Sequence, residues 1–155
     1  MRILAVVLST GLFVTACGST ASTACEGPDF EELDPQSIVH VITDDGVTYL
    51  TDPPTSGPHA SGAIPDGDLD QALSPSLQVA VLERGDIIVQ FQPDVVSAEQ
   101  RSSISGDGVV TFANSDLDAA LIATAWQHRL TCTEFDRDAI VAFRSDHGGF
   151  SDAHN

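Results

Sequence analysis

The chain contains no lysine and only six arginines, against 23 aspartate and glutamate residues, so its 155 residues carry a formal net charge of −17. Phosphate backbones are bound by clustered basic side chains, and this composition therefore argues against nucleic acid as a partner. Cations, basic peptides, solubility or a saline habitat are the explanations that suit such a charge. Because 42% of the residues are hydrophobic, the chain is not a disordered acidic tail, and its length suits one domain.

Residues 3–14 form an apolar run that is too short for a comfortable transmembrane helix, which needs roughly 20 residues. With Met1 and Arg2 before it, this run is typical of a secretory signal. It ends in Val14-Thr15-Ala16-Cys17, which resembles the bacterial lipobox and implies cleavage before Cys17 and a lipid on its sulfur. We therefore expect residues 1–16 to be a lipoprotein signal peptide and the mature protein to be extracytoplasmic, anchored by lipid to the bacterial cell membrane. The alternative is an ordinary cleaved signal in which Cys17 is incidental.

Only three cysteines are present. Residues 17–27 are rich in serine, threonine, alanine and glycine, which predicts a flexible tether carrying the lipidated Cys17. Cys25 and Cys132 then remain as a pair, and outside the cytoplasm such a pair most often forms a disulfide. Metal ligation by these cysteines has less support, since the chain contains no CxxC motif.

Residues 28–150 are expected to form a single α+β domain with a small, mainly antiparallel sheet and one or two helices. Its first part is predicted as an irregular acidic segment over 28–35, a hairpin of strands 38–42 and 47–50, and a long connection over 60–76. Further strands are predicted over 87–91, with one buried face, over 109–113 and over 121–132. A helix over 118–126 is the alternative for the last of these.

Two helix starts have capping signals. Ser97 with Gln100 forms a capping box that predicts a short helix over 97–103. Asp136 is a candidate N-cap for a terminal helix that presents Ala139, Ile140 and Phe143 on one stripe. Gly148 is expected to end that helix at the position after its C-cap.

Residues 53–59 read Pro-Pro-Thr-Ser-Gly-Pro-His, which excludes a helix or a central strand because each proline fixes its own φ and lacks an N–H donor. The sequence predicts a stiff loop that presents Thr55, Ser56 and His59. Together with Tyr49, this heptapeptide resembles the signature of a bacterial family, the domain of unknown function 3105. Leu82-Glu83-Arg84-Gly85 resembles its second motif. Ala125-Trp126 before Phe135-Asp136 resembles its third, so the resemblance extends over most of the mature chain.

The family's second motif reads His-x-Leu-Glu-His-Gly, whereas this chain has Ala80 and Arg84 at the two histidine positions. Any ligand held by that histidine pair would be lost or replaced here. Arg84 offers a positive charge in its place, which would suit a carboxylate or another anion. Members of the family are typically exported or membrane-anchored, which agrees with the predicted signal.

Three functions remain open from the residues. His59, Glu83 and His40 suit a divalent transition metal, since imidazole and carboxylate are good ligands and the proline loop would hold His59 in place. Ser56 with His59 as base would suit a hydrolase, although no orienting acid is apparent. The interpretation we favour is a non-catalytic module that binds a protein or another envelope component, with Ser56, His59, Glu83 and Arg84 as candidate ligand-binding residues. Such a module tolerates the missing histidines.

Overall fold

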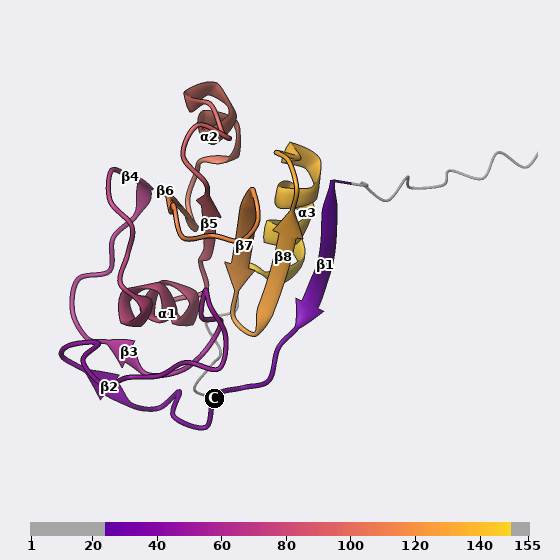
Figure 1. Ribbon diagram of the computed structural model, residues 1–155. Coiled ribbons are helices and arrows are strands. Elements are labelled where there is room, and N and C mark those ends of the chain that lie inside the picture. Colours follow the sequence, from indigo (N-terminus) through magenta and orange to yellow (C-terminus); the bar gives the residue numbers. More distant parts are fainter. Residues whose placement is uncertain (1–23, 150–155) are drawn as a thin grey trace, which may run out of the picture.

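The computed structural model describes residues 24–149 and forms a six-stranded sheet with a second, two-stranded sheet beside it (Figure 1). The predicted signal peptide and Cys17 lie outside the described residues. In sheet order the six strands are β1 (Cys25–Phe30), β8 (His128–Cys132), β7 (Leu121–Ala125), β5 (Ile87–Phe91), β6 (Val109–Ala113) and β4 (Gly67–Leu69). The first four strands pair antiparallel, and β5, β6 and β4 pair parallel. The α+β class and the mainly antiparallel sheet are thus confirmed.

Three helices cover the sheet, one more than the sequence predicted. They are α1 (Pro75–Glu83), α2 (Ala98–Ile104) and α3 (Arg137–His147). Helices α2 and α3 pack against one another, and α3 contacts β7 and β8, whereas α1 packs against β5 and the small sheet. None of the helices in the described part of the chain is long and apolar enough to cross a membrane.

Strand β5 is buried on both faces, so the predicted single buried face was wrong. Its residues Ile87, Val89 and Phe91 enter the apolar cluster that also contains Ile140 and Phe143 of α3. Ile88, on the opposite face, packs with Val81 and Leu82 of α1 in a second cluster. A central strand between two layers has no solvent-facing side, and the period-2 pattern of β5 does not reveal this because its polar member Gln90 is itself fully buried.

The predicted hairpin of strands 38–42 and 47–50 was also wrong. β2 (His40–Val41) pairs in parallel with β3 (His59–Ala60), at the end of the proline loop, and residues 47–50 form no strand. Tyr49 explains the difference. Its hydroxyl donates a hydrogen bond to Pro58 O at 3.0 Å, which places residues 47–50 against the proline loop.

Residues 121–132 form two strands, not one. A turn at Trp126 and Gln127, with Gln127 at φ 58°, reverses the chain between β7 and β8. The alternation of apolar residues continues through this turn, and this continuity made the hairpin resemble one long strand. The helix considered for 118–126 does not form.

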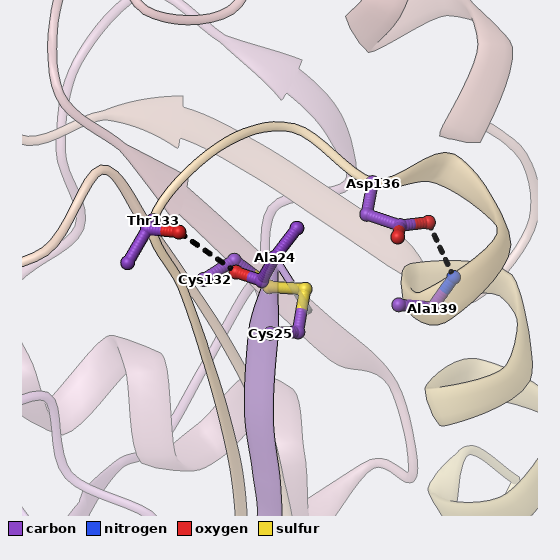
Figure 2. The surroundings of a disulfide bond; sticks show 6 residues. All are labelled: Ala24, Cys25, Cys132, Thr133, Asp136 and Ala139. Atoms are coloured by element: carbon purple, nitrogen blue, oxygen red, sulfur yellow. Dashed lines mark hydrogen bonds between the residues drawn. A yellow bond between two sulfur atoms is a disulfide. The ribbon is translucent and has the colours of Figure 1, made fainter. Parts of the chain in front are cut away.

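The segment predicted as tether and irregular coil over 25–30 is instead the edge strand β1. Cys25 is paired with Cys132 of β8 in the sheet register, and the two form the predicted disulfide (Figure 2). Next to it, Ala24 O accepts hydrogen bonds from the backbone N–H of Thr133 at 2.8 Å and from its hydroxyl at 3.2 Å. The start of the domain is therefore attached to the end of β8 both covalently and by hydrogen bonds.

The two predicted N-caps are confirmed. Ser97 Oγ accepts from Gln100 N at 3.2 Å while Gln100 Oε1 accepts from Ser97 N at 2.8 Å, which completes the capping box of α2. Asp136 Oδ1 accepts from Ala139 N at 3.0 Å at the start of α3 (Figure 2). Gly148 is the C-cap of α3, with φ −81°, so the helix extends one residue further than expected, and the left-handed backbone after it belongs to Gly149, with φ 83°.

Candidate functional site

The proline loop is a buried structural element. All seven residues 53–59 are buried, which contradicts the expectation that the loop presents Thr55, Ser56 and His59 as a surface. Gly57 shows why the sequence is so restricted here, since its φ of 131° is unfavourable for other residues and an added Cβ would lie 2.9 Å from the Tyr49 ring. The loop is held in place by both the sheet and α1.

A pair of charged residues fastens the loop to the sheet. Arg129 of β8 donates hydrogen bonds to Asp52 O at 3.1 Å and Pro53 O at 2.6 Å. Its Nε lies 2.9 Å from Glu31 Oε1, an ion-pair contact that lacks the alignment of a hydrogen bond. Glu31 in turn accepts from the Thr55 hydroxyl at 2.6 Å. Strand β8, the segment after β1 and the proline loop therefore meet at one pair of opposite charges.

His59 and Glu83, which the sequence nominated together, are in contact. His59 is 1% exposed, and its Nε2 lies 2.9 Å from Glu83 Oε2, again at ion-pair distance without hydrogen-bond alignment. Its Nδ1 lies 3.3 Å from Gly57 O. The exposed His40 is its partner in the β2–β3 register, and the two rings meet edge to face with centroids 4.5 Å apart. The contact joins α1 to the small sheet.

The three residues proposed as metal ligands are thus neighbours, but their arrangement differs from a metal site. Within residues 24–149 no group of three histidine, cysteine, aspartate or glutamate side chains is placed to hold one metal ion. The described geometry shows the buried His59 in contact with the partly buried Glu83, and the His40 ring edge to face against that of His59. Metal binding at this place stays a prediction.

Ser56 and His59 are engaged with separate groups. Ser56 Oγ accepts from Asp34 N at 2.9 Å and contacts Glu32 O at 3.5 Å, whereas His59 contacts Gly57 and Glu83. A nucleophile and its base must be within hydrogen-bond reach of one another. Ser56 instead serves to hold the segment around Asp34 against the loop.

Arg84 follows directly after the last residue of α1, and its charge is already neutralised by neighbouring carboxylates. Its guanidinium forms ion pairs with Asp66 and Asp86, and donates to Ile64 O at 3.3 Å and Pro65 O at 3.2 Å. An arginine that already contacts two carboxylates has little charge left for an incoming anion. In this structure Arg84 fixes the connection before β4, which disfavours the anion role.

Asp44 was not predicted as a functional or structural residue, yet it caps α1 from 32 positions away in the sequence. Its carboxylate accepts from Ser76 N at 2.8 Å and from Ser76 Oγ at 3.1 Å. Burial alone would raise the pKa of Asp44, but hydrogen bonds from Ser74, Ser76 and Tyr49 outweigh it and lower that pKa. Burial and the charge of Asp44 raise the pKa of Tyr49 far above its ordinary value. Asp44 therefore acts as a carboxylate at a helix N-terminus, where a negative charge is stabilising.

Arg129, Glu31 and Asp44 escaped sequence analysis because the pairs Arg129–Glu31 and Asp44–Ser76 are 98 and 32 residues apart and follow no local motif. The rarity of arginine was the one available signal. In so acidic a chain, an arginine within a strand is a candidate partner for a buried carboxylate.

The surface near the loop has two hollows that adjoin. One, of about 340 Å³, is lined by Tyr49, Leu50, Thr51, Asp52, Pro54 and Pro75. The other, of about 400 Å³, shares Asp52 and Pro75 with it and extends to the connection after β6. Neither hollow is lined by an arginine. Both volumes fall in the range of roughly 300–1,000 Å³ that is usual for binding pockets.

Comparison with known proteins gives one family and no characterised relative. No curated protein and no solved structure matches this chain. Residues 40–153 match the family model described as "Protein of unknown function (DUF3105)". This match contains all three motifs noted in the sequence and extends over most of the chain, from β2 to beyond α3. The chain therefore belongs to the DUF3105 family.

Proposed function

We propose that this protein is a lipid-anchored, extracytoplasmic binding module without catalytic activity, which captures a protein partner with the end of the domain opposite its anchor. The observation that best supports this proposal is the location of the exposed apolar side chains. Eight large apolar residues of the described chain are exposed, and five of them fall within residues 33–50: Leu33, Ile38, Val39, Ile42 and Leu50. Such a concentration is typical of a surface that associates with another molecule. We call these five residues the apolar patch.

The direction of the chain supports this arrangement. In Figure 1, β1 starts beside α3, while β2 and β3 lie at the other end of the domain. A lipid on Cys17 would be joined to the domain through Ala24 and Cys25, at the α3 end. The patch around β2 would then face away from the membrane, toward other envelope proteins.

Charge defines the partner further. Residues 29–52 contain seven aspartates and glutamates and neither lysine nor arginine. Four of these carboxylates are exposed, those of Asp29, Glu32, Asp45 and Asp52. A partner with an apolar centre and a basic rim would complement this surface and be steered toward it. Catalysis has less support, since Ser56 and His59 are each engaged with other groups.

The anchor is tested by feeding an alkyne-bearing palmitate analogue to bacteria that express the full chain. We expect the natural sequence and a Cys25→Ala control to be labelled, and Cys17→Ala to be unlabelled and released from the membrane fraction. Labelling that survives Cys17→Ala would refute the anchor.

The patch is tested by photo-crosslinking in the same cells. A photoreactive residue placed at Ile42, which is 100% exposed, should give one discrete crosslinked protein. The same residue at Val141 of α3, which is 41% exposed, is the matched control and should not give that product. If Ile42 gives no discrete product, or if both positions capture the same protein, the proposed binding surface is wrong.

A further inference from the structure

The two adjoining hollows differ in chemistry although they share a wall. We call their combined surface the Asp52 cleft, because Asp52 and Pro75 line both parts. Their adjacency means that a short extended segment lying over Asp52 would contact both at once. The properties of each part indicate which side chains such a segment must carry.

The first part suits a large apolar side chain. Tyr49, Leu50, Pro54 and Pro75 supply most of its lining, and Leu50 is 56% exposed at its edge. Its walls are rigid, because prolines have fixed φ and Tyr49 is held by its hydrogen bond to Pro58 O. A preformed apolar hollow loses little conformational freedom when it is filled.

The second part suits a cation. Asp52, Asp116 and Asp118 line it, and no ion pair within residues 24–149 involves their carboxylates. No arginine lines this part to neutralise them. An incoming ammonium or guanidinium would therefore meet three uncompensated negative charges.

Side-chain amides form the floor of this second part and hold it in shape. Gln78 and Asn114 line it, and both are bonded to the fully buried Gln90: Gln90 donates to Gln78 Oε1 at 2.8 Å and accepts from Asn114 at 2.8 Å. Gln78 also donates to Leu73 O at 2.9 Å. A hydrogen-bonded amide chain of this kind, with Gln78 and Gln90 buried, rigidifies the core beneath it. The acidic part is therefore preorganised like the apolar part.

We propose that the Asp52 cleft binds an extended segment of the partner protein in which a large apolar side chain lies next to an arginine or lysine. This inference rests on the proposed function and names the chemistry of the partner. A second copy of this chain is a poorer occupant. Arg84, Arg101, Arg129 and Arg137 already form ion pairs within the chain, which leaves few basic side chains to offer.

The test is a selection from a random decapeptide display library, with the full mature lipidated chain in detergent as bait. Enriched peptides should share a large apolar residue within two positions of an arginine or lysine. A fluorescein-labelled consensus peptide should then bind in solution, measured by fluorescence anisotropy at about 0.15 M salt, where distant charges are largely screened.

Three variants locate the binding. Asp116→Asn with Asp118→Asn should weaken the consensus peptide about three- to tenfold, as expected for two charge contacts at the rim of an interface. Leu50→Ser should weaken it through the apolar part. The matched control is Glu26→Gln with Glu134→Gln, which removes the same charge from exposed positions near Cys25 and Cys132 and should change affinity less than about twofold, because screening suppresses its long-range effect.

Each outcome has a distinct meaning. Enrichment of the apolar–basic motif together with selective loss in the cleft variants supports the inference. No enrichment, a motif without a basic residue, or equal weakening by the control pair overturns it, the last by showing non-specific charge attraction. If crosslinking from Ile42 still captures a protein in those cases, the binding module stands and only the cleft assignment fails. If both experiments fail, the proposed function fails with it.

Discussion

Removing the guanidinium of Arg129 should detach the proline loop from the sheet. Arg129→Met removes three interactions: the 2.9 Å ion pair with Glu31 and the hydrogen bonds to Asp52 O and Pro53 O. Glu31 is only 14% exposed, so its carboxylate would be left with the Thr55 hydroxyl as its hydrogen-bond partner, in a poorly hydrated place. Deleting one partner of a buried pair costs roughly 3–5 kcal/mol. Because Arg129 is 18% exposed, we expect about 2–4 kcal/mol.

The assay is urea unfolding followed by the fluorescence of Trp126, the single tryptophan of the chain, which packs against the α1-side core. Arg137→Met is the matched control, since Arg137 is 54% exposed and contacts Asp138 at 3.5 Å. We expect this control to change stability by less than about 0.5 kcal/mol. Adding Glu31→Gln to Arg129→Met should recover part of the loss, with a coupling of about 1 kcal/mol or more.

A loss below about 1 kcal/mol for Arg129→Met would refute the view that this pair fixes the loop. Equal losses for Arg129→Met and Arg137→Met would refute it too, because the two positions differ chiefly in burial. A coupling near zero would assign the effect to the carbonyl contacts instead of the ion pair.

Three further predictions concern other parts of the domain. Gly57→Ala should destabilise by about 2–4 kcal/mol in the same assay, from backbone strain and the contact with Tyr49; a change under about 0.5 kcal/mol would contradict it. Cys132→Ser should cost about 2–5 kcal/mol through the lost disulfide, and dithiothreitol should then have no further effect. Burial and the nearby His128 lower the pKa of His147 from its usual 6.5, although Asp146 opposes them. The unfolded chain therefore binds this proton first, so stability should fall as the pH drops below about 6.5, and His147→Gln should flatten that slope.

Local signals in the sequence predicted the elements that depend on near neighbours. The capping box at Ser97, the N-cap at Asp136 and strands β5 and β6 formed where their own residues indicated. Each of these elements depends on hydrogen bonds or alternation within a few residues. Tertiary contacts therefore did not change the local preference.

Two of the errors arose from long-range contacts. β1 forms because Cys25 is bonded to Cys132, and β2 pairs with β3 because Tyr49 turns the intervening chain toward Pro58. Composition near each strand does not reveal the pairing, although the Cys25–Cys132 disulfide itself was predicted. In the candidate site, His59 and Glu83 were predicted together as metal ligands, and the structure shows them in contact. The charged residues that hold the loop, Arg129 and Glu31, were not predicted.

The His59–Glu83 pair explains how the family's motifs persist here without the second-motif histidines. Ala80 and Glu83 are three positions apart and lie on one side of α1, so a histidine at position 80 would point to the same region as Glu83. In this chain that region is filled by a buried contact that joins α1 to β3, and Arg84 serves a separate attachment of the chain before β4. The proline motif and Glu83 therefore have a structural reason to remain after any ligand is lost. The same loop, once held in place, forms one wall of the Asp52 cleft through Pro53 and Pro54. The proline motif, which first suggested chemistry at His59, thus contributes to the surface of the protein through the wall of the Asp52 cleft.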